Sequence, residues 1–228
     1  MRRPDGIVVK TMALRGPGRV VGSAIAAVSL LLFVMVTAAV LSDSAGVAAV
    51  DALAARALAQ HLSATAREFL SLVSALHAPR GILALTMLAA VALLWRRDSR
   101  GLLLLLAVVP VGATLNHLLK HTIQRPRPGL EHAVDAVTDF GFPSGHAANA
   151  TLLYGCVAVL LVPHLRSRGA RIAFVLAAVL AAALVSCSRV ALGAHRLSDV
   201  VAGMLLGIAW LALCLVLAGT LPGAHPPD

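Results

Sequence analysis

Long apolar runs separated by short polar segments dominate the chain. Five of these runs approach the length of about 20 residues that a membrane-spanning helix needs. They cover 20–41, 101–119, 147–163, 171–187 and 197–218. A sixth run, 81–95, is short and reaches spanning length only if its helix begins in the turn before it, at Pro79 and Arg80. The pattern predicts an all-α protein, a six-span transmembrane helical bundle that forms one membrane domain over 20–218.

The segment between the first two spans, 42–78, has a different pattern. Its apolar residues recur at helical spacing, with polar residues on the other faces; the apolar set is Val50, Leu53, Ala54, Ala57 and Leu58. This spacing is typical of a helix that lies in the membrane interface. It is equally typical of an ordinary amphipathic helix that packs on the bundle, so both interpretations stay open.

Composition supports lipid as the solvent for much of the surface. The chain is 59% hydrophobic and 13% charged, whereas soluble domains are about 45–50% apolar and about 25% charged. The formal net charge is +9, but the basic residues stand in short clusters between apolar runs. We therefore attribute them to membrane topology and expect membrane lipids, not nucleic acid, as partners.

The arginine clusters predict an orientation. Five basic residues lie in the tail 1–19, three in 96–100 and three in 164–171, all on one side of a six-span bundle. By the positive-inside rule this side is cytoplasmic, together with the tails 1–19 and 219–228. We read the first run as an uncleaved helix and expect a multi-pass protein of the plasma (inner) membrane. Eight further basic residues fall on the outer side and need another explanation.

Counting along the helices brings three polar clusters to this outer side. At a rise of about 1.5 Å per residue, the chain crosses roughly one hydrocarbon thickness from Arg100 to Lys120 and again from His146 to Arg166. The clusters are 120–128, 143–146 and 188–199. Their convergence on the extracytoplasmic face is predicted from span counting alone.

The first cluster concentrates positive charge beside hydrocarbon. Lys120, Arg125 and Arg127 fall within eight residues, and a bound anion would relieve both their repulsion and their desolvation. Arginine offers a planar fork for phosphate oxygens, and lysine a point charge. The alternative is that these side chains only reach out to lipid headgroups.

The second cluster, Pro143-Ser144-Gly145-His146, precedes an apolar run. Proline suits a helix start, serine can cap the helix, and glycine lets a ligand approach the backbone. Free N–H groups at such a helix terminus bind anions. The alternative is a plain helix cap with a surface histidine.

The third cluster pairs a histidine with a carboxylate. His195 and Asp199 are four residues apart, so on a helix they would share a face. A carboxylate that accepts from one ring nitrogen leaves the other nitrogen free to attack, which is the logic of a nucleophile and its orienting group. A structural His–Asp pair is the alternative.

Together the three clusters resemble the motifs of the type 2 phosphatidic acid phosphatase superfamily, which also includes the vanadium haloperoxidases. Lys-x6-Arg-Pro is met by Lys120 and Arg127-Pro128, and Pro-Ser-Gly-His by 143–146. Ser-Arg-x5-His-x3-Asp is met by Ser188, Arg189, His195 and Asp199. The motifs lie within 120–199 and are complete, in order and correctly spaced.

The resemblance implies a role for each motif residue. His195 would attack phosphorus and form a phosphohistidine, and Asp199 would orient it. His146 would protonate the leaving oxygen and then activate water. The phosphoryl oxygens would be held by Lys120, Arg127, Ser144, Gly145 and Arg189. The resemblance implies no metal and no cofactor.

Several other residues stay outside the predicted site. His117 and His121 are also four apart but lack a third metal ligand nearby. Arg125 is left out of the phosphate-binding set, because it can equally line the entrance. The remaining histidines are expected to be interfacial or solvated: His61, His77, His132, His164 and His225.

The sequence thus favours an integral membrane lipid phosphate phosphatase that acts on a phosphate monoester or diphosphate. Substrates of the polyprenyl diphosphate, phosphatidate and phosphatidylglycerophosphate types all fit. The alternatives are a lipid phosphotransferase that uses the same phosphohistidine, and a non-catalytic membrane transporter or scaffold. Complete His195, Asp199 and His146 argue against the last. The sequence leaves the oligomeric state open.

Overall fold

All regular elements described by the computed structural model are helical. The structure describes residues 17–59, 62–128 and 140–219, so most of both predicted tails lies outside it. The helices are α1 (Pro17–Leu41), α2 (Ala45–Ala59), α3 (Ala64–Leu76), α4 (Pro79–Trp95), α5 (Ser99–Ile123), α6 (Gly145–Leu161), the short 3-10 helix η1 (Val162–His164), α7 (Arg168–Ala191) and α8 (Leu197–Ala218). The prediction of an all-α protein is confirmed.

Five helices of the described chain are long and apolar enough to cross a membrane. They are α1, α5, α6 with η1, α7 and α8. A sixth candidate arises when α3 and α4 are taken as one span bent by 58°. Helix α4 begins at Pro79, where a fixed φ and a missing N–H are tolerated, so the short run does begin in the preceding turn.

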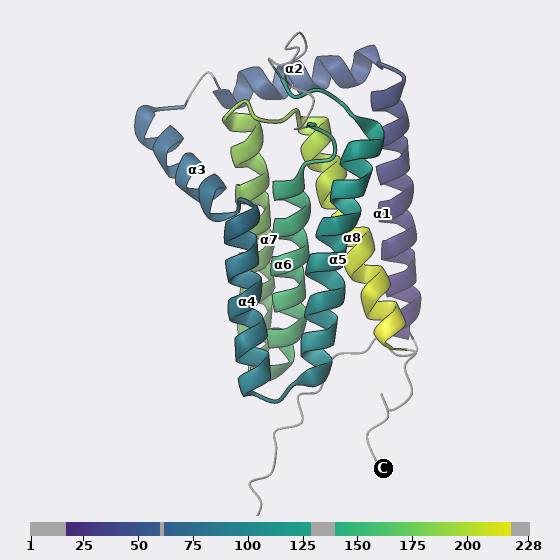
Figure 1. Ribbon diagram of the computed structural model, residues 1–228, viewed down its shortest axis with the longest axis vertical. Coiled ribbons are helices and arrows are strands. Elements are labelled where there is room, and N and C mark those ends of the chain that lie inside the picture. The colour runs from purple at the N-terminus through teal and green to yellow at the C-terminus, as the bar shows by residue number, and fades with distance from the viewer. Residues whose placement is uncertain (1–16, 60–61, 129–139, 220–228) are drawn as a thin grey trace, which may run out of the picture.

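The spanning helices stand side by side, and α2 lies across one end of them (Figure 1). Helix α6 is central and contacts α4, α5, α7 and α8. The outer helices α1 and α7 expose large apolar side chains such as Leu31 and Leu180. Those side chains suit contact with lipid, in which an apolar exterior costs nothing.

Close packing of α8 on α6 depends on small residues. A Cβ atom at Gly203 would lie 2.5 Å from the carbonyl oxygen of Ser144, and one at Gly207 would lie 3.0 Å from the Cβ of Thr151. Only glycine lets the backbones approach this closely, as is common between membrane helices. The N-termini of α6 and α8 are therefore held next to each other.

The 42–78 segment forms two helices, α2 and α3, rather than one. Val50 and Leu53 of α2 are 54% and 68% exposed, whereas Asp51 between them is only 6% exposed. An ordinary packing helix would bury the two apolar residues. The arrangement therefore favours the interfacial interpretation of α2 and turns one carboxylate toward the bundle.

Candidate active site

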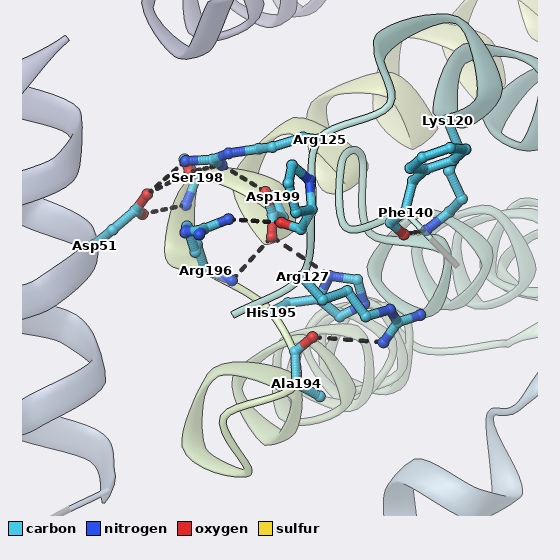
Figure 2. Close-up of polar contacts among 11 residues, drawn as sticks. Asp51, Lys120, Arg125, Arg127, Phe140, Ala194, His195, Arg196, Ser198 and Asp199 are labelled. Carbon is cyan, nitrogen blue, oxygen red and sulfur yellow. Dashed lines mark hydrogen bonds and ion pairs between the residues drawn. The ribbon is translucent and has the colours of Figure 1, made fainter. Parts of the chain in front are cut away.

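The three polar clusters meet at the end of the bundle that α2 crosses (Figure 1), and Figure 2 shows residues of the first and third clusters together. They come from the end of α5, the start of α6 and the turn between α7 and α8. Backbone bonds join them: Ser144 N–H donates to the Asp199 carbonyl at 2.9 Å, and Gly141 N–H donates to the Arg125 carbonyl at 2.7 Å. The convergence deduced from span counting is present in the structure.

His195 and Asp199 lie together, but not on one helix face as expected. His195 is in the turn after α7, and Asp199 is in the first turn of α8. Gly193, with φ of 71°, allows this turn, and His195 N–H donates to the Arg189 carbonyl at 3.1 Å. The helix-face prediction was wrong because the chain turns before His195 and α8 begins only at Leu197.

The His195 side chain approaches Asp199 through one nitrogen. Its Nδ1 lies 3.5 Å from Asp199 Oδ2, and the same oxygen accepts from the Arg196 backbone N–H at 2.9 Å. A separation of 3.5 Å is long for a hydrogen bond, but catalytic contacts often shorten when substrate binds. Protonation at Nδ1 would leave the lone pair on Nε2.

Burial sets the charge state of this histidine. His195 is only 3% exposed, and this burial lowers its pKa below the usual 6.5; nearby Arg127 and Lys120 lower the pKa further, while Asp199 opposes the shift. Desolvation and nearby cations both disfavour the imidazolium. The ring is therefore neutral at neutral pH, the form a nucleophile needs.

Three cations surround the two histidines, and we call Lys120, Arg127 and Arg189 the cation group. Lys120 Nζ donates to the Phe140 carbonyl, and Arg127 Nη1 lies 3.5 Å from the Ala194 carbonyl. His195 is within electrostatic reach of Lys120 and Arg127. Figure 2 shows Arg127 beside His195.

The helix start that carries His146 differs in one detail from expectation. Ser144 has the backbone of an N-cap residue, but its hydroxyl makes no cap bond. That hydroxyl is fully buried and has no hydrogen-bond partner within the described residues. Among the described residues, a Cβ at Gly145 would meet Asn116 Oδ1 alone, at the van der Waals distance of 3.4 Å.

His146 is half-buried in the first turn of α6. It lies within electrostatic reach of Arg189, His195 and Arg127. The structure thus places all the predicted residues at one site, with the two histidines near each other. The Ser188 hydroxyl, by contrast, is buried and donates to the Val185 carbonyl at 2.6 Å, a bond within α7.

Sequence reasoning missed the residues that support Asp199. Arg125, which we had left outside the site, donates from Nη1 to Asp199 Oδ1 at 2.6 Å, and its Nη2 lies 3.3 Å from Asp51 Oδ2. Its position among the basic residues of 120–128 indicated that it binds an anion. The sequence could not show whether this anion is a carboxylate of the protein or a phosphate of the substrate. Asp51 stands far away along the chain and gave no signal.

Helix α3 also reaches the site without a signal in the sequence. Arg189 Nη1 donates to the Ser74 hydroxyl, and Ser74 is 6% exposed.

His77, at the end of the same helix, was expected to be interfacial or solvated but is only 8% exposed. Its Nε2 lies 2.6 Å from the Tyr154 hydroxyl and its Nδ1 2.7 Å from the Val73 carbonyl. That expectation was wrong because His77 ends α3 and packs on α6.

The other histidines behave more simply. His117 and His121 contact each other, with ring centroids 4.4 Å apart, and His121 also contacts Phe140. Residues 17–59, 62–128 and 140–219 contain no group of three or more His, Cys, Asp or Glu side chains that could hold a metal ion. His164 is exposed, as expected. The expectations for His61, His132 and His225 fall outside the described residues.

Comparison with known proteins agrees with this geometry. A model of the PAP2 superfamily matches residues 100–221, which include every motif residue. The chain is 33% identical over 183 residues to phosphatidylglycerophosphatase B of Bacillus subtilis (strain 168), covering 79% of this chain and 89% of the relative.

A solved structure is similar as well. The crystal structure of a transmembrane PAP2 type phosphatidylglycerolphosphate phosphatase from Bacillus subtilis matches with a TM-score of 0.73 and 30% sequence identity. The match covers 83% of this chain and 93% of that chain. The chain belongs to the PAP2 superfamily. It is a multi-pass membrane lipid phosphate phosphatase of that superfamily.

The surroundings of His195 predict an unusual titration. In protein labelled at histidine and held in detergent, the His195 NMR signal should titrate below pH 6.5, because burial and Arg127 disfavour the charged ring. Asp199→Asn should lower the midpoint further, since the carboxylate favours the imidazolium. His195→Gln assigns the signal. A midpoint at or above 6.5 would contradict the account of this site.

Proposed function

We propose that this phosphatase hydrolyses a lipid phosphate monoester or diphosphate through a phosphohistidine on His195. The supporting observation is a neutral, buried imidazole beside Asp199, close to the cation group and to His146. These are a nucleophile, its orienting group, positive charge for phosphoryl oxygens and a proton donor. No single one of them carries the proposal, because each also occurs in structural roles.

In the first step Nε2 of His195 attacks phosphorus, and the bond from phosphorus to the lipid oxygen breaks. The negative charge of the bound substrate offsets Arg189 and Arg127 beside His146, so in the substrate complex His146 can carry a proton. It gives this proton to the lipid oxygen, and the lipid leaves as an alcohol or a lipid monophosphate. Asp199 stabilises the positive charge that develops on the attacking ring. The cation group, the Ser144 hydroxyl and the N–H groups that start α6 hold the phosphoryl oxygens.

In the second step water replaces the enzyme. His146, now neutral, takes a proton from a water molecule as its oxygen attacks the phosphohistidine. The bond between phosphorus and Nε2 breaks, and inorganic phosphate forms. His146 ends protonated, as in the substrate complex, and His195 ends neutral, so the proton balance of the cycle is closed.

For the substrate, we put the phosphatidylglycerophosphate type first. The B. subtilis relative is named a phosphatidylglycerophosphatase, and it aligns over most of both chains. A site at the end of a membrane bundle allows lipid tails to remain in the bilayer while the headgroup reaches His195. Phosphatidate and polyprenyl diphosphates present the same terminal phosphoryl group.

We further propose that the site faces the outside of the plasma (inner) membrane. At the opposite end of the bundle the arginines are exposed; they are Arg19, Arg96, Arg97, Arg100, Arg166, Arg168 and Arg171. At the site end, several cations instead contact site residues, such as Arg125 with Asp199 and Arg196 with the Pro126 carbonyl. When the cations that contact site residues are left out of the comparison, the exposed arginines at the opposite end favour a cytoplasmic position for that end.

Purified protein should release phosphate from short-chain phosphatidylglycerophosphate, phosphatidate and polyprenyl diphosphate, fastest from the first. Release should continue in EDTA, because the cation group supplies the positive charge. His195→Ala serves as the inactive control. If wild-type protein released no phosphate from any of the three, or only transferred it to an added alcohol, the proposed hydrolysis would be wrong.

The role of His146 predicts a dependence on the leaving group. His146→Ala should slow kcat by about 10²- to 10⁴-fold with a lipid alkyl phosphate, because it removes general acid–base help. With an activated aryl phosphate the first step needs little protonation, so formation of the phosphoenzyme should be slowed least. Equal losses of the phosphorylation rate on both substrates would remove His146 from the role of general acid.

Labelling of intact cells tests the orientation. In a Cys187→Ala background, which removes an exposed thiol, a cysteine in place of Ser63 should react with an impermeant maleimide. Ser63 is exposed and precedes α3 near the site end, whereas Ser99 is exposed at the opposite end. A cysteine in place of Ser99 should react only after permeabilisation. The reverse pattern would invert the proposed topology.

A further inference from the structure

Asp51 on the crossing helix α2 is joined to the catalytic carboxylate by a continuous set of polar contacts (Figure 2). Its Oδ1 accepts from the Ser198 backbone N–H at 2.8 Å, and its Oδ2 accepts from the Ser198 hydroxyl at 2.7 Å. Arg125 lies between the two carboxylates, with Nη2 3.3 Å from Asp51 and Nη1 2.6 Å from Asp199. The same Nη1 donates to the Ser198 hydroxyl at 2.7 Å.

These contacts are consistent in direction. The Ser198 hydroxyl accepts from Arg125 and donates to Asp51, so its donor and one acceptor position are both used. Asp51 and Asp199 are 6% and 0% exposed, and one guanidinium serves both. Partly buried charge pairs of this kind are costly to break, because the remaining charge is left without compensation.

The contacts bear on the orientation of His195. Arg125 and His195 approach different oxygens of Asp199, Oδ1 and Oδ2. If Asp51 were neutral, Arg125 would interact with Asp199 alone and would draw more of its negative charge. Less charge would remain to stabilise the imidazolium that forms when His195 attacks.

We infer that Asp51 is a positioning residue for catalysis, which acts on His195 through Arg125 and Asp199. It stands outside the three motifs, on the helix that crosses the end of the bundle. The polar side of α2 thereby supports the active site, while Val50 and Leu53 face outward. The inference rests on the proposed function, since it assigns a role within that reaction.

The first test separates catalysis from substrate binding. Asp51→Asn keeps the shape of the side chain and should lower kcat for phosphate release from short-chain phosphatidate by about 10- to 100-fold, the range for loss of an outer hydrogen-bond partner. KM should change little, because Asp51 and Lys120 lie on opposite sides of Asp199 (Figure 2). Glu68→Gln, an exposed acid on α3, is the matched control and should behave as wild type.

The second test asks whether Asp51 acts through Arg125. In an Arg125→Gln background the two carboxylates no longer share a guanidinium, so adding Asp51→Asn should cause no further loss of kcat. A purely structural anchor would lower kcat equally in both backgrounds. Equal losses would overturn the inference.

Two further outcomes are decisive. If wild-type protein is active and Asp51→Asn has the same kcat as Glu68→Gln, the inference is wrong while the proposed function stands. An inactive wild-type protein would instead contradict the proposed function.

If Asp51→Asn does not fold, Ser198→Ala replaces it, since it removes the hydroxyl between Asp51 and Arg125 and leaves every charge. Ser198→Ala should lower kcat several-fold at constant KM, and an unchanged kcat would again overturn the inference.

Discussion

The buried carboxylate of Asp199 is the point on which the arrangement of the site depends. It is fully buried, and its two oxygens contact Arg125, the Arg196 backbone N–H and His195. Its backbone carbonyl accepts from Ser144, at the start of α6. A charge so far from water is stable only with several such partners. These contacts hold the segment that follows α5 and the turn between α7 and α8 against the start of α8, and the backbone bond from Ser144 adds the start of α6.

Contacts within the protein also account for two of the basic residues at that end of the bundle. Arg125 compensates Asp199 and Asp51, and Arg196 donates to the backbone of the segment that follows α5. Lys120, Arg127 and Arg189 lie around the two histidines, where we propose that they hold a phosphoryl group. Under this proposal a lipid substrate would bring its negative charge to the site while its tails stay in the bilayer.

Much of this could be predicted from the sequence, because apolar runs of spanning length fix the helices and span counting fixes which polar clusters meet. Local geometry was harder. His195 and Asp199 were placed on one helix face, yet α8 begins only after His195, and four-residue spacing does not reveal a helix start. His77 was assigned to the interface because its partner Tyr154 is remote in sequence. Asp51 was missed for the same reason: its contacts with Arg125 and Ser198 exist only in the folded chain.

Mapping the trapped phosphoenzyme would test whether His195 carries the phosphoryl group. Wild-type protein would be mixed with an activated aryl phosphate, quenched rapidly in base, because phosphohistidine is acid-labile, and digested for mass spectrometry. We expect one phosphorylated peptide that contains His195, lost in His195→Ala and retained in His146→Ala. An alkali-stable phosphopeptide that persists in His195→Ala would place the nucleophile at another residue and remove His195 from this role.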